Sequence, residues 1–467
     1  MLIGWASVDI TPSRPVLLRG QFVTRISQRV NDPLTATALA LEGRGVGGAP
    51  EQAILVSCDR VSIPCVVYQR VCDAVAALVP DFDPAMLIVA ATHTHTAPEI
   101  EEGFYPPVDD PGVMTPTEYA DFFVERVAEA VARAWRSRAE GAVSWGLSHA
   151  VVGHNRRIAY ADGSSRMYGR TDREDFEHVE GYEDHTLEAL LTWDCGGKLT
   201  GAVVNLACPA QVSEAESFVS ADFWHEVRSE LRRRYGEEVF VLPQCSAAGD
   251  QSPHLLLYSQ AEERMRCLRG LSEREDIARR ISEAMRDVVE ASAKAVYTDP
   301  CLRHVMQAID LPRRLVTREE YEEAAAEYER LQAQSPDPTD LNATSSHYIL
   351  SNRCRWVMER YKSQKPGEPA SVEVHALRLG DVAMATNPFE LFLDYGLRIK
   401  ARSKAVQTFV VQLAGSRFGE VCSYLPTARA LAAKGYGAAA ADSLFGPEGG
   451  KVLVERTVEM VNELWAG

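Results

Sequence analysis

The sequence has no long hydrophobic run and no excess of positive charge. It contains no stretch of about 18 consecutive apolar residues, so we expect no transmembrane helix and no membrane insertion. Its formal net charge is −17, which argues against a surface that binds nucleic acid. The opening stretch MLIGWASVDITP lacks the basic and apolar regions of a signal peptide. We therefore interpret it as a first strand and expect a cytoplasmic protein.

The sequence also lacks paired cysteines. Its ten cysteines are scattered, and none forms a Cys-x-x-Cys pair of the kind found in redox and zinc motifs. We therefore expect reduced, mostly buried thiols and no disulfides. What is present is ordinary for a globular protein. Hydrophobic residues make up 46% of the chain and charged residues 25%, which is enough apolar sequence for a sizeable core.

Short apolar runs alternate with amphipathic stretches in the first half of the chain. Alternation of strands with helices predicts an α/β fold whose sheet is covered by helices. The expected helices are 117–138, with Thr117 as its N-cap, and 220–236. The expected strands are 35–41, 52–58, 86–92, 142–152, a pair within 186–207, and 238–244.

The second half contains a segment of a different character. Residues 316–364 hold two helical, charged stretches separated by the polar break SPDPTDLNATSS, which predicts a helical hairpin inserted into the α/β body. Because we find no internal repeat, we expect one domain over 1–467 that carries this insertion. After the insertion the pattern predicts, in order, a β-hairpin over 372–388, a helix from Pro388 and a closing helix over 450–465.

The stretch IVAATHTHTAP places two histidines at the end of a buried strand. His93 and His95 are two positions apart, so in a strand their side chains point to the same face. Sites in open α/β sheets lie beyond the carboxyl ends of strands. Imidazole is the commonest metal ligand in proteins. A single histidine here would most often be a hydrogen-bonded structural residue, whereas a pair favours a metal-binding or catalytic role.

Three further stretches carry candidate site residues. In PQCSAAGDQSP, Asp250 and Ser252 lie in a tight turn, where these residue types suit either a site or ordinary turn chemistry. In TNPFELFLDYG, Glu390 lies in an expected first helical turn, where a carboxylate either stabilises the helix terminus or faces a metal ion. Tyr424, in CSYLPT, precedes a proline-containing turn and by itself indicates little.

Together these stretches resemble the catalytic domain of the neutral/alkaline (non-lysosomal) ceramidases and their shorter bacterial relatives. The matching segments occur in the order typical of that family, from near residue 1 to about residue 430. They are GWASVDITP, ILVSCDRVSI, IVAATHTHTAP, GHNRRI, SADF, GDQSP, NPFE and SYLPT. The resemblance implies a mixed β-sheet flanked by helices and a zinc-dependent hydrolase that cleaves an amide bond.

The resemblance also implies a metal site. One zinc ion would be bound by His93, Glu390 and Tyr424. Catalytic zinc sites keep an open position for water. Zinc lowers the pKa of that water towards neutrality, which would supply a nucleophile at neutral pH.

Other matching residues would act on the substrate. The resemblance implies that His95 stands beside the ion and contacts the substrate. Arg156 would hold a substrate oxygen and stabilise a developing oxyanion. Ser252 would match the active-site serine of the family, and Asp250 beside it is a further catalytic candidate. Gln211 is a candidate for substrate binding.

One position departs from the family pattern. The family places another zinc-binding histidine in a segment of the type N-F-A-C-H-P, whereas this sequence reads NLACPAQ, with Pro209 at that position. Proline cannot coordinate a metal through its side chain. His225, in SADFWHE, and Cys208 are the candidates to replace the missing ligand. We favour His225 because it replaces an imidazole with an imidazole, and the thiolate of Cys208 is the alternative.

The length of the chain also differs from that of the ceramidases. Ceramidases carry an additional immunoglobulin-like domain and many are secreted, whereas this chain ends soon after the SYLPT match. Nothing in the sequence resembles an exposed amphipathic helix that docks on a membrane. We therefore expect a small, polar substrate rather than long-chain ceramide, and we expect the inserted hairpin to cover the site.

Three functions remain open at this stage. The favoured one is a zinc-dependent hydrolase of an amide or related bond. The second is a metal enzyme of the same scaffold with different chemistry, such as an ester, glycoside or lyase reaction on a polyol or sugar derivative. The third is a metal-free binding protein that lost its ion together with the ligand at Pro209. We expect a small-molecule substrate and no nucleic acid, and the sequence leaves a homo-oligomer open.

Overall fold

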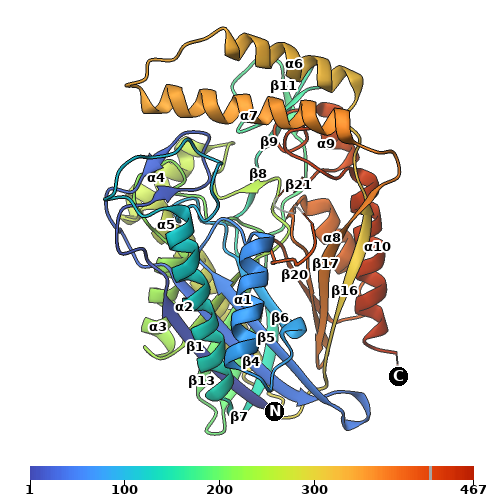
Figure 1. The fold of residues 1–467 in the computed structure, drawn as a ribbon. Helices are drawn as coiled ribbons and strands as arrows, with labels where there is room; N and C mark the ends of the chain where they lie inside the picture. The colour runs from blue at the N-terminus through green and yellow to red at the C-terminus, as the bar shows by residue number, and fades with distance from the viewer. Residues whose placement is uncertain (420–422, 467) are drawn as a thin grey trace.

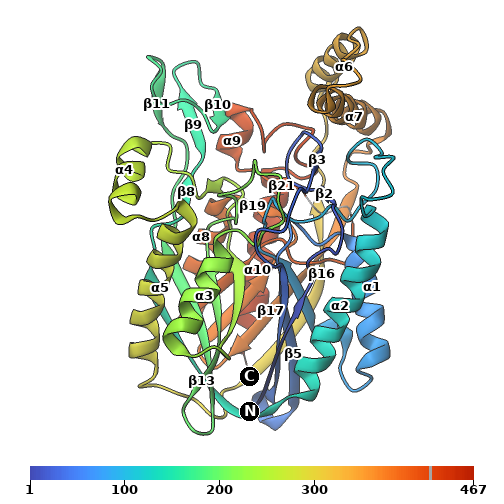
Figure 2. The same cartoon turned by 90° about the vertical axis from the view of Figure 1, so that its left-hand side faces the viewer.

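Two β-sheets packed face to face form the centre of the molecule, and helices cover their outer faces (Figures 1 and 2). The computed structural model describes residues 1–419 and 423–466. The strands of the larger sheet are β1 (Leu2–Asp9), β4 (Thr35–Arg44), β5 (Pro50–Cys58), β6 (Leu87–Ala91), β7 (Ala139–His149), β12 (Thr186–Asp194), β13 (Leu199–Leu206) and β14 (Phe240–Cys245). Those of the smaller sheet are β16 (Leu302–Pro312), β17 (Pro369–Leu379), β18 (Val382–Thr386) and β20 (Gln407–Val411).

The larger sheet is mixed. Its eight strands follow the order β14-β13-β12-β7-β1-β4-β5-β6 and are antiparallel except at the two edges, where β13 pairs with β14 and β5 with β6 in parallel. The predicted α/β fold with a mixed sheet flanked by helices is therefore confirmed. The second sheet was not predicted. Its first strand, β16, carries arginine, histidine and glutamine within LRHVMQAIDLP and has no continuous apolar run.

Helices form the two outer layers of the molecule. Both faces of the central strands are therefore buried, and β4 shows how its sequence fits this position. Ala36, Ala38 and Ala40 face the helices, where small side chains allow close packing, whereas Leu39 and Leu41 face the second sheet. The helices are α1 (Cys65–Leu78), α2 (Pro116–Arg136), α3 (Phe223–Tyr235) and α5 (Glu273–Ser292) on the larger sheet, and α8 (Leu393–Arg402) and α10 (Pro447–Glu463) on the smaller.

The predicted helical hairpin is also present. Its helices α6 (Arg318–Gln332) and α7 (Leu341–Ser363) lie across one end of the two sheets, at the top of Figure 1. The remaining elements are short: β2 (Leu17–Leu18), β3 (Arg25–Ile26), η1 (Val46–Gly48), η2 (Pro84–Met86), β8 (His154–Asn155), β9 (Arg157–Tyr160), β10 (Ser165–Met167), β11 (Phe176–Val179), β15 (Gln251–Ser252), α4 (Ser259–Arg269), β19 (Glu390–Leu391), β21 (Tyr424–Leu425) and α9 (Ala428–Ala433).

Two predicted helix starts were wrong. The N-cap of α2 is Thr115 rather than Thr117, because Thr115 and Glu118 form a capping box around a proline at the first helical position. The helix expected from Pro388 begins later. Glu390 instead lies in the short strand β19, which pairs in parallel with β21, and α8 follows it.

The ends of strands that lie far apart in the larger sheet come close together. β6, β13 and β14 belong to one sheet, although β6 and β14 lie at opposite edges. The sheet curves so that these edges approach each other, and residues 412–415 bridge them. The backbone NH of Gln412 donates to the carbonyl of Cys245 at 3.0 Å, and that of Gly415 to the carbonyl of Val89 at 2.8 Å. The chain segments that follow β6 and β14 therefore lie at the same end of the sheet.

Two further expectations concern disulfides and membrane-spanning helices. Among the described residues 1–419 and 423–466, the cysteines other than Cys65 are free thiols, and Cys422 lies outside these residues. In the same part of the chain, every helix is too short or too polar to cross a bilayer.

A buried ion pair joins the strand ends to a covering helix. Arg228, on α3, donates to both carboxylate oxygens of Asp59 at 2.9 Å. Asp59 also accepts from the backbone NH of Thr35 at 2.8 Å, and the hydroxyl of Thr92 lies 3.4 Å from it. The side chain of Asp59 is fully buried, so the pair lies in a region of low dielectric constant.

We predict that Asp59→Ala lowers the free energy of unfolding by about 3–5 kcal/mol, because it leaves the guanidinium of Arg228 buried without its partner. The measurement is urea unfolding followed by circular dichroism. Glu238→Ala is the matched control, since it breaks an exposed ion pair with Lys198 and should leave the stability nearly unchanged. Equal stability of the two variants would contradict the prediction.

Candidate active site

A cavity of about 550 Å³ opens at the end of the two sheets, next to α7. His93, His95, Glu390 and Tyr424 all line it, and so do residues of α7. The structure therefore brings together four of the predicted site residues, which come from three distant parts of the sequence. A cavity of this size is typical of small-molecule sites.

His93 stands where the chain leaves β6. The backbone on either side continues to pair with the end of β5, since Thr92 donates to the carbonyl of Cys58 and Thr94 to that of Arg60. His93 itself adopts a φ of 65°, in the left-handed region. This conformation costs roughly 1–2 kcal/mol for a residue with a Cβ, and such strain is often found at functional sites.

The ring of His93 has a fixed orientation. Its Nδ1 lies 2.7 Å from the carbonyl oxygen of Val61. A carbonyl only accepts, so Nδ1 carries the proton and Nε2 presents a lone pair. That Nε2 lies 3.3 Å from a carboxylate oxygen of Glu390 and 3.4 Å from Nε2 of His95.

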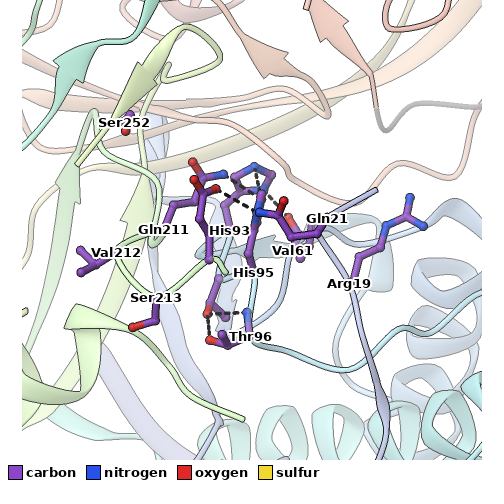
Figure 3. A network of polar contacts seen from close by, with 12 residues as sticks. Arg19, Gln21, Val61, His93, His95, Thr96, Gln211, Val212, Ser213 and Ser252 are labelled. Carbon is purple, nitrogen blue, oxygen red and sulfur yellow. Dashed lines mark hydrogen bonds and ion pairs between the residues drawn. The ribbon is translucent and has the colours of Figure 1, made fainter. Parts of the chain in front are cut away.

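His95 lies between two polar side chains, of which Gln211 is seen in Figure 3. The amide nitrogen of Gln211 lies 2.7 Å from its Nε2, and a carboxylate oxygen of Glu214 lies 3.4 Å from its Nδ1. Burial lowers the pKa of His95 to about 4, although the hydrogen bond with Glu214 acts in the opposite direction. The ring is therefore neutral near pH 7. Gly20 packs against it so closely that a Cβ there would lie 2.4 Å from Cγ of His95.

Glu390 and Tyr424 reach the site through the pairing of β19 with β21, in which they are direct partners. Burial raises the pKa of the Glu390 carboxyl, but His93, Arg156 and the Tyr424 hydroxyl outweigh it, so the net shift is downward. Burial and the neighbouring carboxylate raise the pKa of Tyr424 well above its usual value. In the absence of a cation the pair is therefore a carboxylate and a neutral phenol.

Arg156 connects the elements around the cluster. One terminal nitrogen donates to the hydroxyl of Tyr168 at 3.0 Å and to Oε1 of Gln211 at 3.3 Å. The other donates to the carbonyl of Gly249 and to the hydroxyl of Tyr424, each at 3.1 Å. Its guanidinium lies 4.0 Å from the Glu390 carboxylate, so its charge is balanced within the site.

Asp250 and Ser252 occupy different places from the histidines. Both carboxylate oxygens of Asp250 accept hydrogen bonds, one from the backbone NH of Leu393 at 2.9 Å and one from the amide of Asn155 at 2.8 Å. The hydroxyl of Ser252 accepts from the backbone NH of His254 at 3.0 Å, and Figure 3 shows it well apart from His93 and His95. The structure thus places Asp250 as a support of the site, not as a group facing the cavity.

The structure does not bring His225 or Cys208 to His93. The thiol of Cys208 is fully buried against the carbonyl of Val152, 3.3 Å away, and burial raises its pKa well above the usual value. His225 lies in the first turn of α3, and its side chain makes no hydrogen bond or ion pair with any residue of 1–419 or 423–466. Neither residue lines the cavity, and the replacement of the ligand missing at Pro209 by one of them stays a prediction.

Glu214 was missed by the sequence analysis. It lies in the irregular stretch AQVSEAESF, between β13 and α3, where the sequence offers no periodic pattern. Its carboxylate approaches His95 on one side and His254 on the other, at 3.4 and 3.9 Å. The only hint was its position three residues after Gln211.

The side chains of His93, Glu390 and Tyr424 are of chemical types that bind metal ions. His93 offers a lone pair with its other nitrogen anchored, Glu390 a carboxylate and Tyr424 a phenol, and zinc accepts nitrogen and oxygen donors. Among the described residues, however, no three His, Cys, Asp or Glu side chains stand in a position to hold an ion. The amide of Gln211 lies against Nε2 of His95.

We predict that Asp250→Asn lowers the free energy of unfolding by about 1–3 kcal/mol, because one amide oxygen replaces two acceptors and leaves a buried donor unpaired. Asp109→Asn, in an exposed loop, is the control and should behave as the wild type in the same urea titration. Unchanged stability of Asp250→Asn would favour the catalytic role that the sequence predicted.

Comparisons with known proteins agree with this architecture. The structure is similar to the neutral ceramidase from Pseudomonas aeruginosa, with a TM-score of 0.70 and 16% identity over 99% of this chain and 74% of that one. It is also similar to a ceramidase complexed with C2, with a TM-score of 0.68 and 15% identity over 99% of this chain and 75% of that one. No family model and no curated protein matches the sequence. The protein therefore has a neutral ceramidase-like fold.

Proposed function

We propose that this protein is a metal-dependent hydrolase that cleaves an amide or related bond in a small, polar substrate. The observation that carries the proposal is the pairing of His93 with Glu390 on the cavity wall. The imidazole is anchored through Nδ1 and directs its Nε2 at the carboxylate, 3.3 Å away. The similarity in fold to two ceramidases supports hydrolysis of an amide.

In this proposal His93, Glu390 and Tyr424 would hold a zinc ion. Such an ion, when bound, acts as a Lewis acid and lowers the pKa of a water molecule towards neutrality. Arg156 would donate to the substrate oxygen on which negative charge develops. Its guanidinium is already fixed by Tyr168 and the Gly249 carbonyl, so little reorganisation is required when the substrate arrives.

Support for a polar substrate comes from the charged and amide groups that lie among the mainly apolar residues of the cavity wall. Arg19 pairs with Glu99 at 2.7 Å, Arg353 pairs with Asp442, and Asn352 also lines the cavity. Charged and amide groups of this kind would have to lose water against a long alkyl chain, at a cost that an apolar contact does not offset. A polar substrate of modest size suits them better.

Helix α7 forms one wall of this cavity and is attached to the body at both ends. Near its start, Ser345 accepts from the backbone NH of Thr24 at 2.9 Å. Near its end, Arg360 donates to the carbonyls of Ala440 and Ser443 at 3.0 Å. The hairpin would therefore act as a fixed wall that selects the substrate.

A second candidate function is favoured by Pro209. The loss of a nitrogen ligand at that position would alter the metal site, and an altered site on the same scaffold could serve an ester, a glycoside or a lyase reaction. A metal-free binding protein is the third candidate.

The experiment that tests the proposed function measures bound metal and activity in the same preparation. We expect purified protein to contain zinc by mass spectrometry, to hydrolyse short polar N-acyl amides, and to lose activity with a chelator until zinc is restored. Glu390→Gln should lower kcat/KM by at least about 100-fold. Activity confined to esters or glycosides would favour the second candidate, and protein without metal that only binds ligands would favour the third.

Replacement of the hairpin tests the substrate-selecting wall. Val316 and Gln364 are joined by two hydrogen bonds, of 2.7 and 2.9 Å, so a short glycine-serine linker can replace residues 318–362 without moving the ends. We expect a higher KM and relaxed substrate preference with zinc content unchanged. Asn352→Ala, which alters the wall alone, should change KM in the same direction. Loss of zinc from the linker variant would contradict this role.

A further inference from the structure

Two arginine side chains line the cavity in addition to the cluster around His93. Arg19 lies in the loop between β2 and β3, and Arg353 lies on α7 of the inserted hairpin. Figure 3 shows Arg19 apart from the rings of His93 and His95. The cavity therefore has a second polar region, which the cluster around His93 does not account for.

The guanidinium of Arg19 is held by two neighbours. Its Nη1 donates to a carboxylate oxygen of Glu99 at 2.7 Å, and its Cζ lies 3.3 Å from the centre of the Phe104 ring. The side chain of Arg19 is 23% exposed and that of Glu99 only 3%, so the arginine faces the cavity. Its Nε and Nη2 make no hydrogen bond with any residue of 1–419 or 423–466. These two nitrogens form one edge of the guanidinium plane, and such an edge matches the two oxygens of a carboxylate.

Arg353 is held in a similar way. Its Nη2 donates to Asp442, whose side chain is 2% exposed, and its Cζ lies 4.8 Å from the centre of the Phe22 ring. The side chain of Arg353 is 24% exposed, and its Nε and Nη1 have no hydrogen-bond partner among the described residues. Asn352 precedes it on α7 and also lines the cavity, and its amide is likewise without a hydrogen bond in the described part of the chain. The hairpin thus presents unused donors to the cavity.

One small apolar cluster connects the two arginines. Ile349 of α7 belongs to this cluster, and the rings of Phe22 and Phe104 pack against it. Because Arg353 lies over the first ring and Arg19 over the second, the two guanidinium groups flank the same cluster. The loop after β2 and the hairpin therefore contribute their free N–H groups to one region of the cavity wall.

We propose that Arg19 and Arg353, with the amide of Asn352, bind a carboxylate of the substrate. The substrate is then an amide that carries a carboxylate, such as an N-acyl amino acid. This inference rests on the proposed function, since it names the class of amide. A carboxylate suits these arginines better than a dianion such as a phosphonate, because Glu99 and Asp442 each already balance one positive charge.

Glu101 is the group on this wall that opposes an anion. It lines the cavity, and its side chain makes no hydrogen bond or ion pair with any described residue. Because it is exposed, water and salt screen its charge. We therefore expect Glu101 to weaken the binding of a carboxylate without preventing it, and its neutralisation reports whether the bound group is negative.

The test is isothermal titration calorimetry of the full chain with N-methanesulfonyl amino acids, each compared with its uncharged carboxamide. The sulfonamide bond resists hydrolysis, so the titration measures binding alone. We expect the acids to bind at least about 10-fold more tightly than the carboxamides, because hydrogen bonds to charged groups are the stronger ones. Arg19→Gln and Arg353→Gln should each remove most of this preference and change carboxamide binding far less.

Two further variants serve as controls. Arg355→Gln is the matched control, because Arg355 is exposed on the same helix and does not line the cavity. It should bind the acids as tightly as the wild type. Glu101→Gln should bind the acids more tightly and the carboxamides as before. Weaker acid binding by Glu101→Gln would contradict the proposal.

Substitution of either arginine leaves a buried carboxylate without its partner, so folding is checked by circular dichroism. If Arg353→Gln is unfolded, it is combined with Asp442→Asn and read with the same expectation. If Arg19→Gln is unfolded, Arg19→Lys is read in its place. Lysine retains the charge beside Glu99 but lacks the planar edge, so this variant should also lose most of the preference for acids.

The outcomes separate this inference from the proposed function. Equal binding of acids and carboxamides, absence of binding by every acid, or tighter binding of the matching phosphonates would overturn the inference. A preference for acids that survives both arginine substitutions would overturn it as well. Hydrolysis of neutral amides would in each of these cases leave the proposed function standing. A preference for acids that depends on both arginines, in a protein that hydrolyses no amide, would overturn the proposed function and leave the carboxylate site.

Discussion

The buried ion pair between Asp59 and Arg228 determines where three strand ends and a helix meet. Both carboxylate oxygens of Asp59 are engaged by the guanidinium at 2.9 Å, and the start of β4 and the residue after β6 bind the same carboxylate. Thr92, which contacts Asp59, directly precedes His93. The pair therefore sets the position from which the first site residue leaves the sheet, and it does so where water cannot compete.

The curvature of the larger sheet brings the remaining residues of the site together. In a flat sheet β6 and β14 would lie at opposite edges, and the segments that follow them would not meet. Here residues 412–415 hydrogen-bond to both edges and hold them together. The same backbone leads on to β21, whose pairing with β19 sets Tyr424 beside Glu390. The site is thus a consequence of the way the edges close, and each of its side chains comes from a segment that follows a strand.

Pro209 lies in the turn after β13, at the position where the resemblance to ceramidases implied a histidine. With proline at that position the turn after β13 contributes no imidazole, and the same turn buries Cys208 against Val152. Residues a little further along fill the space. Gln211 reaches Nε2 of His95 and Glu214 reaches its Nδ1, so His95 is enclosed by groups that orient it.

The sequence by itself determined the α/β class, most of the helices and strands and the inserted hairpin, and it singled out His93, His95 and Glu390 as candidates. Periodicity and capping are local, and a strand followed by histidines is visible in eleven residues. Only the tertiary structure decided the second sheet, the strand at Glu390, the hydrogen bonds that bury Asp250, and the contact between Glu214 and His95. Each of these depends on pairing between segments far apart in the chain. Local sequence carries no signal for such pairing, because hydrogen-bond partners and burial arise only when the edges of the sheet close.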